Sequence, residues 1–358
     1  MGKKYRNLFD KIANKDALWA AYHKASKGKK NSSGYLGSRL DAGAMIDRLY
    51  TELINGTYRP GKTRQFIIYE PKPRQIDALP FRDRVVQHAL HAVIEPIFDK
   101  VFLPNSFACR HGKGTHKGVK SLQAELRRMS KTGPVWVLKT DFSKYFHSVP
   151  GAAINKEIRR KISCRKTLAL IEMYHPPSVT GIRIGWLTSQ LMANVCGHIL
   201  DRQLTHVFRV RRWWRYMDDV VILARSREFL ALLQHLLTYF VKHHMGMRWS
   251  KWSISRSTQG INFLGYRIWH DHKLIRKDSV RRAKRKIINF IKFNEPEELT
   301  KFLASWMGHI QWADTQNLLI YLESQYALLL QSRNPRVDHR HSACLYSEYT
   351  TFLDRATA

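Results

Sequence analysis

The sequence predicts an α+β protein, and three observations support that class. Two apolar, β-prone runs flank the adjacent carboxylates Asp218 and Asp219, and the downstream run covers residues 220–223, which indicates strand, tight turn and strand. A second β-rich run, residues 135–138, leads into Asp141. Before and after these strands, apolar residues recur at helical spacing, so helices are expected as well.

The pair Asp218-Asp219 is the first candidate for chemistry. Neighbouring carboxylates repel one another, and Mg²⁺ prefers one or two carboxylates together with substrate phosphates. On a neighbouring strand, Asp141 could complete a site for two cations about 3.5–4 Å apart, which would activate an attacking oxygen and stabilise a leaving one. A solvated surface turn is the structural alternative for the pair, and a strand-end helix cap is the alternative for Asp141.

The charge of the chain is strongly unbalanced. Sixty-one Lys and Arg residues stand against 28 Asp and Glu, a formal net charge of +33 in 358 residues. A folded protein with this field is expected to bind a polyanion, with counterion release driving the affinity. An anionic membrane is the alternative, but no amphipathic anchor stands apart from the expected core, and no apolar run of ~18 residues predicts a span.

The sequence also favours a reducing setting. Residues 1–6 are basic but no apolar segment follows them, so a signal peptide is not expected. The cysteines, Cys109, Cys164, Cys196 and Cys344, form no Cys-x-x-Cys pair, which argues against a zinc site or a disulfide framework. We therefore expect a cytoplasmic protein.

A basic hairpin is expected after a polar N-terminal segment. Residues 1–64 are basic and mostly polar, and glycines are expected to divide them into short pieces. Residues 66–69 and 74–76 then predict two strands. Lys72 and Arg74 at the tip could bind a triphosphate, because Arg offers a two-pronged donor. An edge strand blunted by charge is the alternative.

A helix and a basic loop are expected next. Residues 81–95 have helical spacing, and Pro96 is expected to bend or end the helix. The Gly-rich loop at residues 106–116 carries Arg110 and Lys113 before another helix, an arrangement that suits an anion.

A third loop leads into a buried helix. Residues 182–190 precede apolar positions at helical spacing. Gly185 permits close approach of another backbone, and Ser189 is expected to cap the helix.

The C-terminal part is predicted to be helical. Residues 279–291 place an apolar stripe on one side and Arg281, Arg282 and Arg285 on the other, which suits contact with a nucleic-acid backbone. Two further helices and a polar tail are expected at residues 297–312, 318–330 and 333–358.

Taken in order over residues 60–330, these features resemble a reverse transcriptase. The strongest signal is Tyr216-Met217-Asp218-Asp219 together with Asp141 followed by aromatic residues. The basic hairpin, the Phe263-Leu264-Gly265 stretch and the C-terminal helices follow the order of that family.

A narrower resemblance comes from Ile184-Gly185 and Ser189-Gln190. Most reverse transcriptases have Gln-Gly and Ser-Pro at these places, whereas Ser-Gln is similar to the enzymes of diversity-generating retroelements. Four other segments are also similar to these retroelement enzymes: residues 69–74, 110–116, 142–144 and 260–269.

The resemblance implies a right-hand polymerase with fingers, a ferredoxin-like palm and a helical thumb. The implied parts are a basic N-terminal extension (1–64), fingers (65–134), palm (135–270, with a fingers segment around 151–185), thumb (271–332) and tail (333–358).

The resemblance also implies a metal site. Asp141 and Asp218 would ligate two Mg²⁺ ions, the Phe142 carbonyl would help, and Asp219 would support the pair. All three aspartates are then catalytic residues for attack of a primer 3′-hydroxyl on a deoxynucleotide.

Further residues are implied around the incoming nucleotide. Lys72 and Arg74 would contact its triphosphate, and Phe146, beside Tyr145, stands where the family places a ring that excludes a 2′-hydroxyl. The remaining nucleotide-binding residues are Ile184, Gly185, Ser189 and Gln190, and Lys251 is a loosely spaced match to a later family lysine.

The implied function is error-prone synthesis of cDNA from a template RNA. The retroelement enzymes misincorporate opposite adenines, and the cDNA diversifies a target gene in a bacterial or phage-infected cell. Expected partners are template RNA, the primer–template duplex, deoxynucleotides and a small basic pentameric accessory protein. The alternatives are a reverse transcriptase of another bacterial retroelement or defence system, and an inactive RNA-binding scaffold.

Overall fold

The computed structural model describes residues 4–29, 33–69, 73–322 and 324. Two compact units divide the chain, Met1–Leu264 and Gly265–Ala358. Lys72, at the expected hairpin tip, and the expected tail at 333–358 lie outside the described residues. Within the described ranges, no helix has the length and apolar character needed to cross a membrane.

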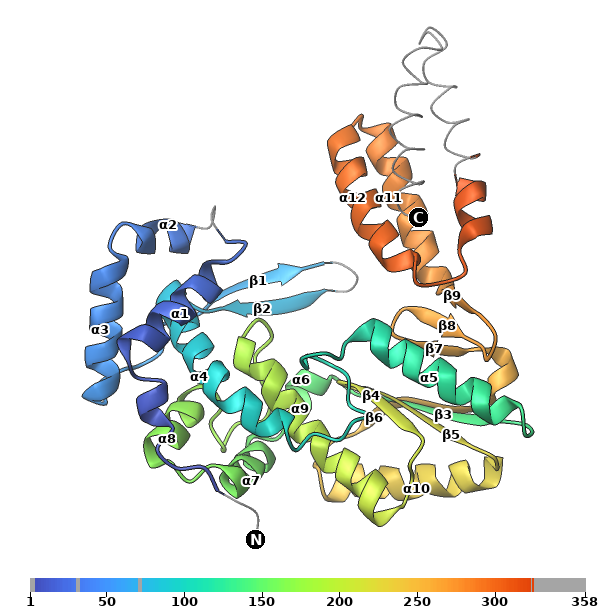
Figure 1. The fold of residues 1–358 in the computed structure, drawn as a ribbon, viewed down its shortest axis with the longest axis horizontal. Coiled ribbons are helices and arrows are strands. Elements are labelled where there is room, and N and C mark those ends of the chain that lie inside the picture. Colours follow the sequence, from blue (N-terminus) through green and yellow to red (C-terminus); the bar gives the residue numbers. More distant parts are fainter. Residues whose placement is uncertain (1–3, 30–32, 70–72, 323, 325–358) are drawn as a thin grey trace, which may run out of the picture. The chain divides into compact units, whose positions relative to one another are not determined.

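The N-terminal residues pack into the core of the first unit. The elements here are η1 (Phe9–Lys11), α1 (Lys15–Ser26), α2 (Ser33–Arg39), α3 (Ala42–Ile54) and α4 (Phe81–Asp99). The prediction of short, glycine-divided pieces is wrong, because α1 and α3 are continuous and bury Leu18, Ile46 and Leu49. Figure 1 shows α1 against α4, so this segment is part of the fold.

The helix α4 also runs past its predicted end. Pro96 lies inside it and the helix continues to Asp99. A proline removes one backbone donor from a helix. Ile97 and Phe98 in the last turn are buried, so of the two expectations for Pro96, that it ends the helix is not met.

The expected hairpin is confirmed. Strands β1 (Arg64–Ile68) and β2 (Arg74–Ala78) pair antiparallel, with Arg64 opposite Ala78 and Ile68 opposite Arg74. β1 is exposed along its length, whereas Asp77 of β2 is buried. The hairpin extends from the N-terminal helices (Figure 1).

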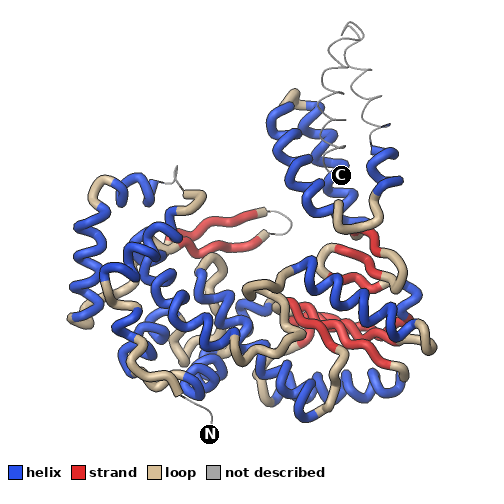
Figure 2. The backbone as a smooth tube through the Cα atoms, in the orientation of Figure 1, coloured by secondary structure: helices blue, strands red, loops and turns tan. Residues whose placement is uncertain are grey.

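A four-stranded antiparallel sheet forms the other main part of the first unit. Its strands are β3 (Trp136–Phe142), β4 (Trp213–Tyr216), β5 (Asp219–Ala224) and β6 (Trp249–Arg256), in the order β4-β5-β3-β6. Figure 2 shows these strands side by side. β5 is apolar and buried over Val220–Ala224, as expected for a strand covered by helices.

Helices between these strands complete the first unit. They are α5 (Thr115–Ser130), α6 (Tyr145–Ser148), α7 (Gly151–Lys161), α8 (Arg165–Tyr174), α9 (Leu187–Arg202), the π-turn η2 (Gln203–Val207) and α10 (Arg227–His243). α10 packs on β3, β5 and β6, and α5 lies against the edge strand β4. In Figure 1 these two helices appear on opposite sides of the sheet. The short elements η3 (Ser257–Gln259) and β7 (Ile261–Phe263) close the unit.

The second unit is small and mostly helical in its described part. It contains β8 (Tyr266–Ile268), β9 (Lys273–Ile275), α11 (Lys277–Lys292), α12 (Pro296–Ile310) and helical residues 316–322. β8 pairs antiparallel with β9. Leu264 and Gly265, with φ of +52° and +91°, form a turn between β7 and β8.

Candidate active site

Three carboxylates predicted from the sequence lie together at one end of the four-stranded sheet. Asp141, near the end of β3, is the register partner of Asp219, the first residue of β5. Asp218 stands in the two-residue turn between β4 and β5, and its carbonyl accepts from the Phe142 backbone N–H at 3.4 Å. The hydroxyl of Ser250 on β6 donates to the Asp141 carbonyl at 3.0 Å.

Burial and mutual repulsion make Asp218 hard to ionise. Its pKa is raised to about 6, first by burial and then by the charges of Asp141 and Asp219, and a hydrogen bond with Asp141 adds to the shift. A proton shared by two carboxylates satisfies them in the absence of a cation. The cluster therefore attracts a cation that can take the place of that proton.

Lys139 is a residue that the sequence reasoning missed. It lies two positions before Asp141 on β3, so both side chains point to the same face of the sheet. Its ammonium is 3.1 Å from Asp219 and also donates to the Asn262 carbonyl. The alternation along β3 could have revealed it, because a lysine on the face of an acidic cluster is a natural counter-charge.

Arg215 is the second residue that was missed. It is fully buried on β4, two residues before the turn that begins at Met217 and contains Asp218. Its guanidinium forms a two-pronged pair with Asp201 of α9 at 2.7 and 2.8 Å. It also donates to the hydroxyl of Ser106 at 2.9 Å and to the Met217 carbonyl at 3.2 Å. The sequence signal was an arginine inside an otherwise apolar and aromatic strand.

The buried arginine keeps its charge and needs space. Burial alone would lower the pKa of Arg215, but the Asp201 carboxylate raises it above the ordinary value. Gly197 on α9 provides the room, since a Cβ there would lie 2.4 Å from the guanidinium Nη1. The charged pair thus links α9 to the turn that carries Asp218.

The donor set fits part of a magnesium site. Two carboxylates in hydrogen-bond contact, one of them with a raised pKa, are oxygen ligands suited to Mg²⁺. Among the described residues no group of three or more His, Cys, Asp or Glu side chains has the arrangement of a complete metal site. The remaining ligands would be water, a backbone carbonyl and substrate phosphates, as Mg²⁺ commonly prefers.

The aromatic residues after Asp141 separate into packed and half-buried positions. Phe142 and Tyr145 are buried, with ring centres 5.1 Å apart, and the Tyr145 hydroxyl donates to the Ala193 carbonyl at 2.8 Å. Phe146 is only half-buried. Of the two neighbouring rings, Phe146 is the one with surface left to meet a ligand.

The loop before α9 lies against β2 of the hairpin. The Ile184 carbonyl accepts from the Asp77 N–H at 2.8 Å. Gly185 has a φ of +106°, and a Cβ there would lie 2.8 Å from Ile76, so the predicted close approach is confirmed. Arg74 is exposed, three residues earlier on β2 than Asp77.

Ser189 is not the helix cap that the sequence suggested. α9 begins at Leu187, so Ser189 lies inside its first turn, buried, and its hydroxyl has no partner among the described atoms. The Gln87 side chain accepts from the Leu187 N–H at 3.0 Å and takes the role of cap. Gln190 is exposed on α9.

The predicted basic contacts differ in their surroundings. Arg110 is used inside the fold: it pairs with Asp99 and donates to the Leu103 carbonyl at 2.7 Å, and its side chain, 8% exposed, has little surface left for a nucleic acid. Lys113 donates to the Pro104 carbonyl at 2.7 Å. Lys251 is exposed and is the register partner of Asp141 on β6. The three arginines on α11, Arg281, Arg282 and Arg285, are exposed.

Comparison with known proteins agrees with the motif order. Residues 62–268, more than half of the chain, match the family described as reverse transcriptase (RNA-dependent DNA polymerase). The matched range contains the hairpin β1–β2, the whole four-stranded sheet and all three carboxylates.

Individual relatives are distant. Protein YkfC of Escherichia coli (strain K12) is 25% identical over 317 residues, covering 74% of this chain and 78% of that protein. The group II intron-encoded protein LtrA of Lactococcus lactis subsp. cremoris is 24% identical over 215 residues, covering 55% of this chain and 35% of that protein. The chain thus spans about a third of LtrA.

One solved structure with a similar chain is telomerase from Candida albicans in complex with a fragment of telomeric RNA. The TM-score is 0.45 at 11% identity, over 71% of this chain and 53% of that chain. The family match, which covers the carboxylate cluster and the sheet that holds it, shows that this chain belongs to the reverse transcriptase family of RNA-directed DNA polymerases, with the expected α+β right-hand polymerase fold.

Proposed function

We propose that this chain copies a template RNA into DNA for a mutagenic retroelement, with errors concentrated at template adenines. The observation that carries the polymerase part is the cluster of Asp141, Asp218 and Asp219 at the end of the sheet. The mutagenic part rests on the resemblance at Ile184 and at Ser189-Gln190. The cDNA would diversify a target gene in a bacterial or phage-infected cell.

Enzymes of this family generally use divalent metal ions, and Asp141 and Asp218 are the residues that would hold two Mg²⁺, with the Phe142 carbonyl as a further ligand. When bound, such ions activate the primer 3′-hydroxyl and neutralise charge on the leaving pyrophosphate. Asp219, paired with Lys139, supports Asp218 beside it. The buried Arg215 donates to the Met217 carbonyl in the turn that carries Asp218, so this carboxylate would be positioned before the substrate binds.

The incoming deoxynucleotide would lie between the sheet and the hairpin β1–β2. Lys72 and Arg74 would bind its triphosphate, and Phe146 would exclude a 2′-hydroxyl. Ile184 and Gly185 would approach the sugar and template base, and Ser189 and Gln190 would line the same pocket.

Ile184 is our candidate for a source of error. An apolar side chain where other reverse transcriptases carry glutamine removes a hydrogen-bonding group, and selectivity falls when polar contacts are absent. Arg74 would contribute through its contact with the triphosphate.

The nucleic-acid partners are proposed from charge, and the accessory protein from the resemblance alone. Template RNA and the primer–template duplex would meet the exposed arginines of α11, Arg281, Arg282 and Arg285, with Lys113 as a further contact. A small basic pentameric accessory protein and a cytoplasmic setting belong to the same proposal.

A second candidate keeps the chemistry and changes the biology. The matches to LtrA and to a putative COX1/OXI3 intron 1 protein of Saccharomyces cerevisiae, 27% identical over 215 residues, favour a reverse transcriptase of the group II intron kind. An enzyme of that kind would copy RNA without a preference for errors at adenine. An inactive RNA-binding scaffold would retain RNA affinity and extend no primer.

The experiment is primer extension on a defined RNA template with Mg²⁺, followed by sequencing of the products. Errors concentrated at template adenines support the mutagenic proposal. Errors distributed evenly over all four template bases favour the second candidate. Ile184→Gln is expected to lower the adenine errors while leaving total synthesis similar, and Val179→Gln, an exposed position before the same loop, is the matched control. If Ile184→Gln made the same frequency of errors at template adenines as the wild type, Ile184 would not be a source of those errors.

A further inference from the structure

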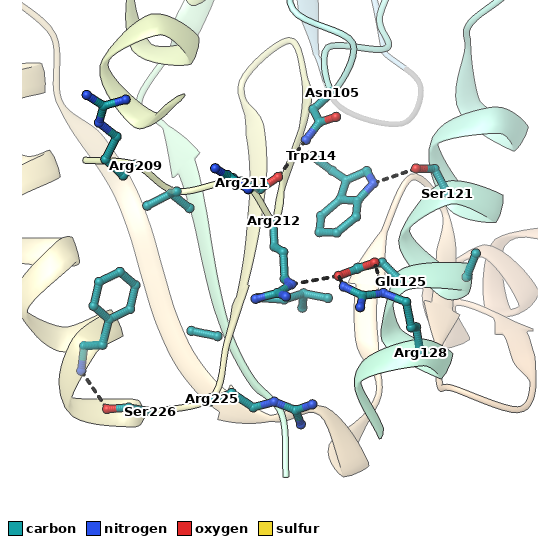
Figure 3. A pocket seen from close by; sticks show the side chains of 15 residues that line it. Asn105, Ser121, Glu125, Arg128, Arg209, Arg211, Arg212, Trp214, Arg225 and Ser226 are labelled. Atoms are coloured by element: carbon teal, nitrogen blue, oxygen red, sulfur yellow. Dashed lines mark hydrogen bonds and ion pairs between the residues drawn. The ribbon is translucent and has the colours of Figure 1, made fainter. Parts of the chain in front are cut away.

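An arginine-rich groove lies at the end of the sheet away from the carboxylates. Its volume is about 1110 Å³, and α5, the segment before β4 and the start of α10 form its walls (Figure 3). The lining includes five arginines and a single carboxylate: Arg128, Arg209, Arg211, Arg212, Arg225 and Glu125.

The groove is separate from the active site. Strands β4 and β5 both run between the two places, since Asp219 begins β5 and Ala224, at the other end, lines the groove. At about 3.3 Å per residue, Ala224 lies roughly 16 Å from Asp219 along β5. The lining residue on β4 is Trp214, which pairs with Val221, two positions from Asp219. None of the three aspartates lines the groove.

Part of the groove is held rigid by internal contacts. Glu125 of α5 is bound by Arg128 at 2.9 Å and by Arg212 at 2.8 Å, and these bonds lower the pKa of its carboxyl, with that from Arg128 the largest cause (Figure 3). Arg225 donates to the Met129 carbonyl at the end of α5 at 2.7 Å. The guanidinium groups are therefore fixed before any ligand arrives.

Two other arginines are available to a ligand. Arg209 and Arg211 are exposed, and neither side chain forms an ion pair within the part of the chain that the structure describes. Arg209 has a φ of +56°, just after the turn η2, where glycine is the favoured residue. A non-glycine residue in this conformation costs about 1–2 kcal/mol, and such positions are candidates for a functional side chain.

Apolar side chains complete the groove. Val210, Trp214 and Leu223 form a buried floor, and the Trp214 ring is fixed by a hydrogen bond to the Ser121 hydroxyl at 3.0 Å. Phe229, at the start of α10, is 44% exposed and lies at the rim. An exposed ring beside guanidinium groups is suited to stack on an unpaired base.

We propose that this groove binds the phosphodiester backbone of a folded RNA outside the active site. The ligand would be a part of the template RNA that is not being copied, so the proposal rests on the use of an RNA template. Arginine matches phosphate with two parallel hydrogen bonds, and a net charge of +33 selects a polyanion over a single acidic side chain. An acidic protein segment is the other class of ligand, and the test separates the two.

The test compares two double variants with the same loss of charge. Arg209→Gly with Arg211→Ala removes the available arginines, and glycine suits the backbone at position 209. Lys11→Ala with Lys156→Ala removes two exposed lysines from elsewhere in the first unit and is the control. The probe is a fluorescein-labelled RNA hairpin, measured by anisotropy across a salt series, with excess unlabelled primer–template duplex present to fill the active site.

The groove variant is expected to bind the hairpin about tenfold more weakly, with a salt dependence lower by roughly 1–2 units of log–log slope, and the control to lose much less. Equal losses in the two variants would overturn the proposal. The proposal would also be overturned if a glutamate-rich peptide displaced the labelled hairpin at a lower concentration than the unlabelled hairpin does. That result would assign the groove to an acidic protein.

Primer extension on a short, unstructured RNA template separates this proposal from the proposed function. The groove variant is expected to extend such a template at the wild-type rate. If the groove variant lost synthesis on the unstructured template, the claim that the groove is separate from the active site would be overturned. If neither wild type nor variant synthesised DNA but the hairpin difference persisted, the polymerase proposal would fail and the groove would stand as an RNA site.

Discussion

The Arg215 guanidinium donates to the Met217 carbonyl at 3.2 Å, and Met217 holds a φ of +53° in the turn that presents Asp218. A non-glycine residue in the left-handed region costs about 1–2 kcal/mol. The buried contact offsets that cost and ties the turn to Asp201 on α9. The position of Asp218, a candidate catalytic carboxylate, therefore depends on the buried ion pair between Arg215 and Asp201.

Arg215→Lys should damage catalysis more than substrate binding. Lysine keeps a positive charge near Asp201 but cannot form the two-pronged pair and also reach Met217. We expect kcat to fall about 10²-fold through displacement of Asp218, with the KM for deoxynucleotide little changed. Steady-state primer extension measures both constants. Arg225→Lys is the matched control, because Arg225 directly follows β5, at the end of that strand opposite the turn that carries Asp218. This variant should leave kcat unchanged. A raised KM at normal kcat would contradict the positioning role.

Gly197→Ala should destabilise the protein although alanine normally favours a helix. A Cβ at this position would lie 2.4 Å from Nη1 of Arg215, so the pair or the helix must shift, at a cost of about 1–3 kcal/mol. Gly43→Ala in α3, where nothing lies within 4 Å, is the control and should stabilise by up to about 1 kcal/mol. Denaturant unfolding compares the two, and equal effects of the same sign would show that Gly197 makes no room for Arg215.

DNA synthesis should decline as the pH falls through about 6. Below the raised pKa of Asp218 its carboxyl is protonated, and a protonated carboxyl is a poor ligand for Mg²⁺. Because metal and proton compete, a higher Mg²⁺ concentration should move the midpoint to lower pH. Rates of primer extension from pH 5 to 8 at two Mg²⁺ concentrations measure this. A midpoint that does not respond to Mg²⁺ would assign the titration to another group.

Lys139→Gln should move the same midpoint to higher pH. Without the ammonium 3.1 Å away, the Asp219 carboxylate is left to act on its neighbour, and like charge raises the pKa of Asp218 further. Lys156→Gln, on the exposed face of α7, is the control and should leave the profile in place. A profile unchanged by Lys139→Gln would show that Lys139 has only a structural role.

The strands and the acidic cluster were predictable because they depend on local patterns. The apolar run after Asp219 and the β-rich run before Asp141 each indicate a strand by themselves, and the structure pairs those two residues across neighbouring strands. The hairpin β1–β2 was predictable for the same reason.

What the sequence did not reveal depends on contacts between distant segments. Arg215 and Asp201 lie on different elements, and no spacing rule joins them. The cap of α9 comes from Gln87, a hundred positions away, so Ser189 was a reasonable but wrong choice. The helices α1 and α3 were missed because the prediction rested on the basic, polar composition and the glycines of residues 1–64 as a whole. Yet α1 contains no glycine, and its buried positions Leu18, Ala21, Tyr22 and Ala25 have helical spacing.

The most direct test of the central claim is RNA-templated primer extension by the wild type, Asp141→Asn and Asp218→Asn, with Mg²⁺ present. The account predicts synthesis by the wild type and a loss of about 10²–10³-fold or more in each variant, with RNA binding retained. Asparagine keeps the shape of the side chain but removes the charge that attracts the metal. Wild-type synthesis by Asp218→Asn would contradict the assignment of this cluster as the active site.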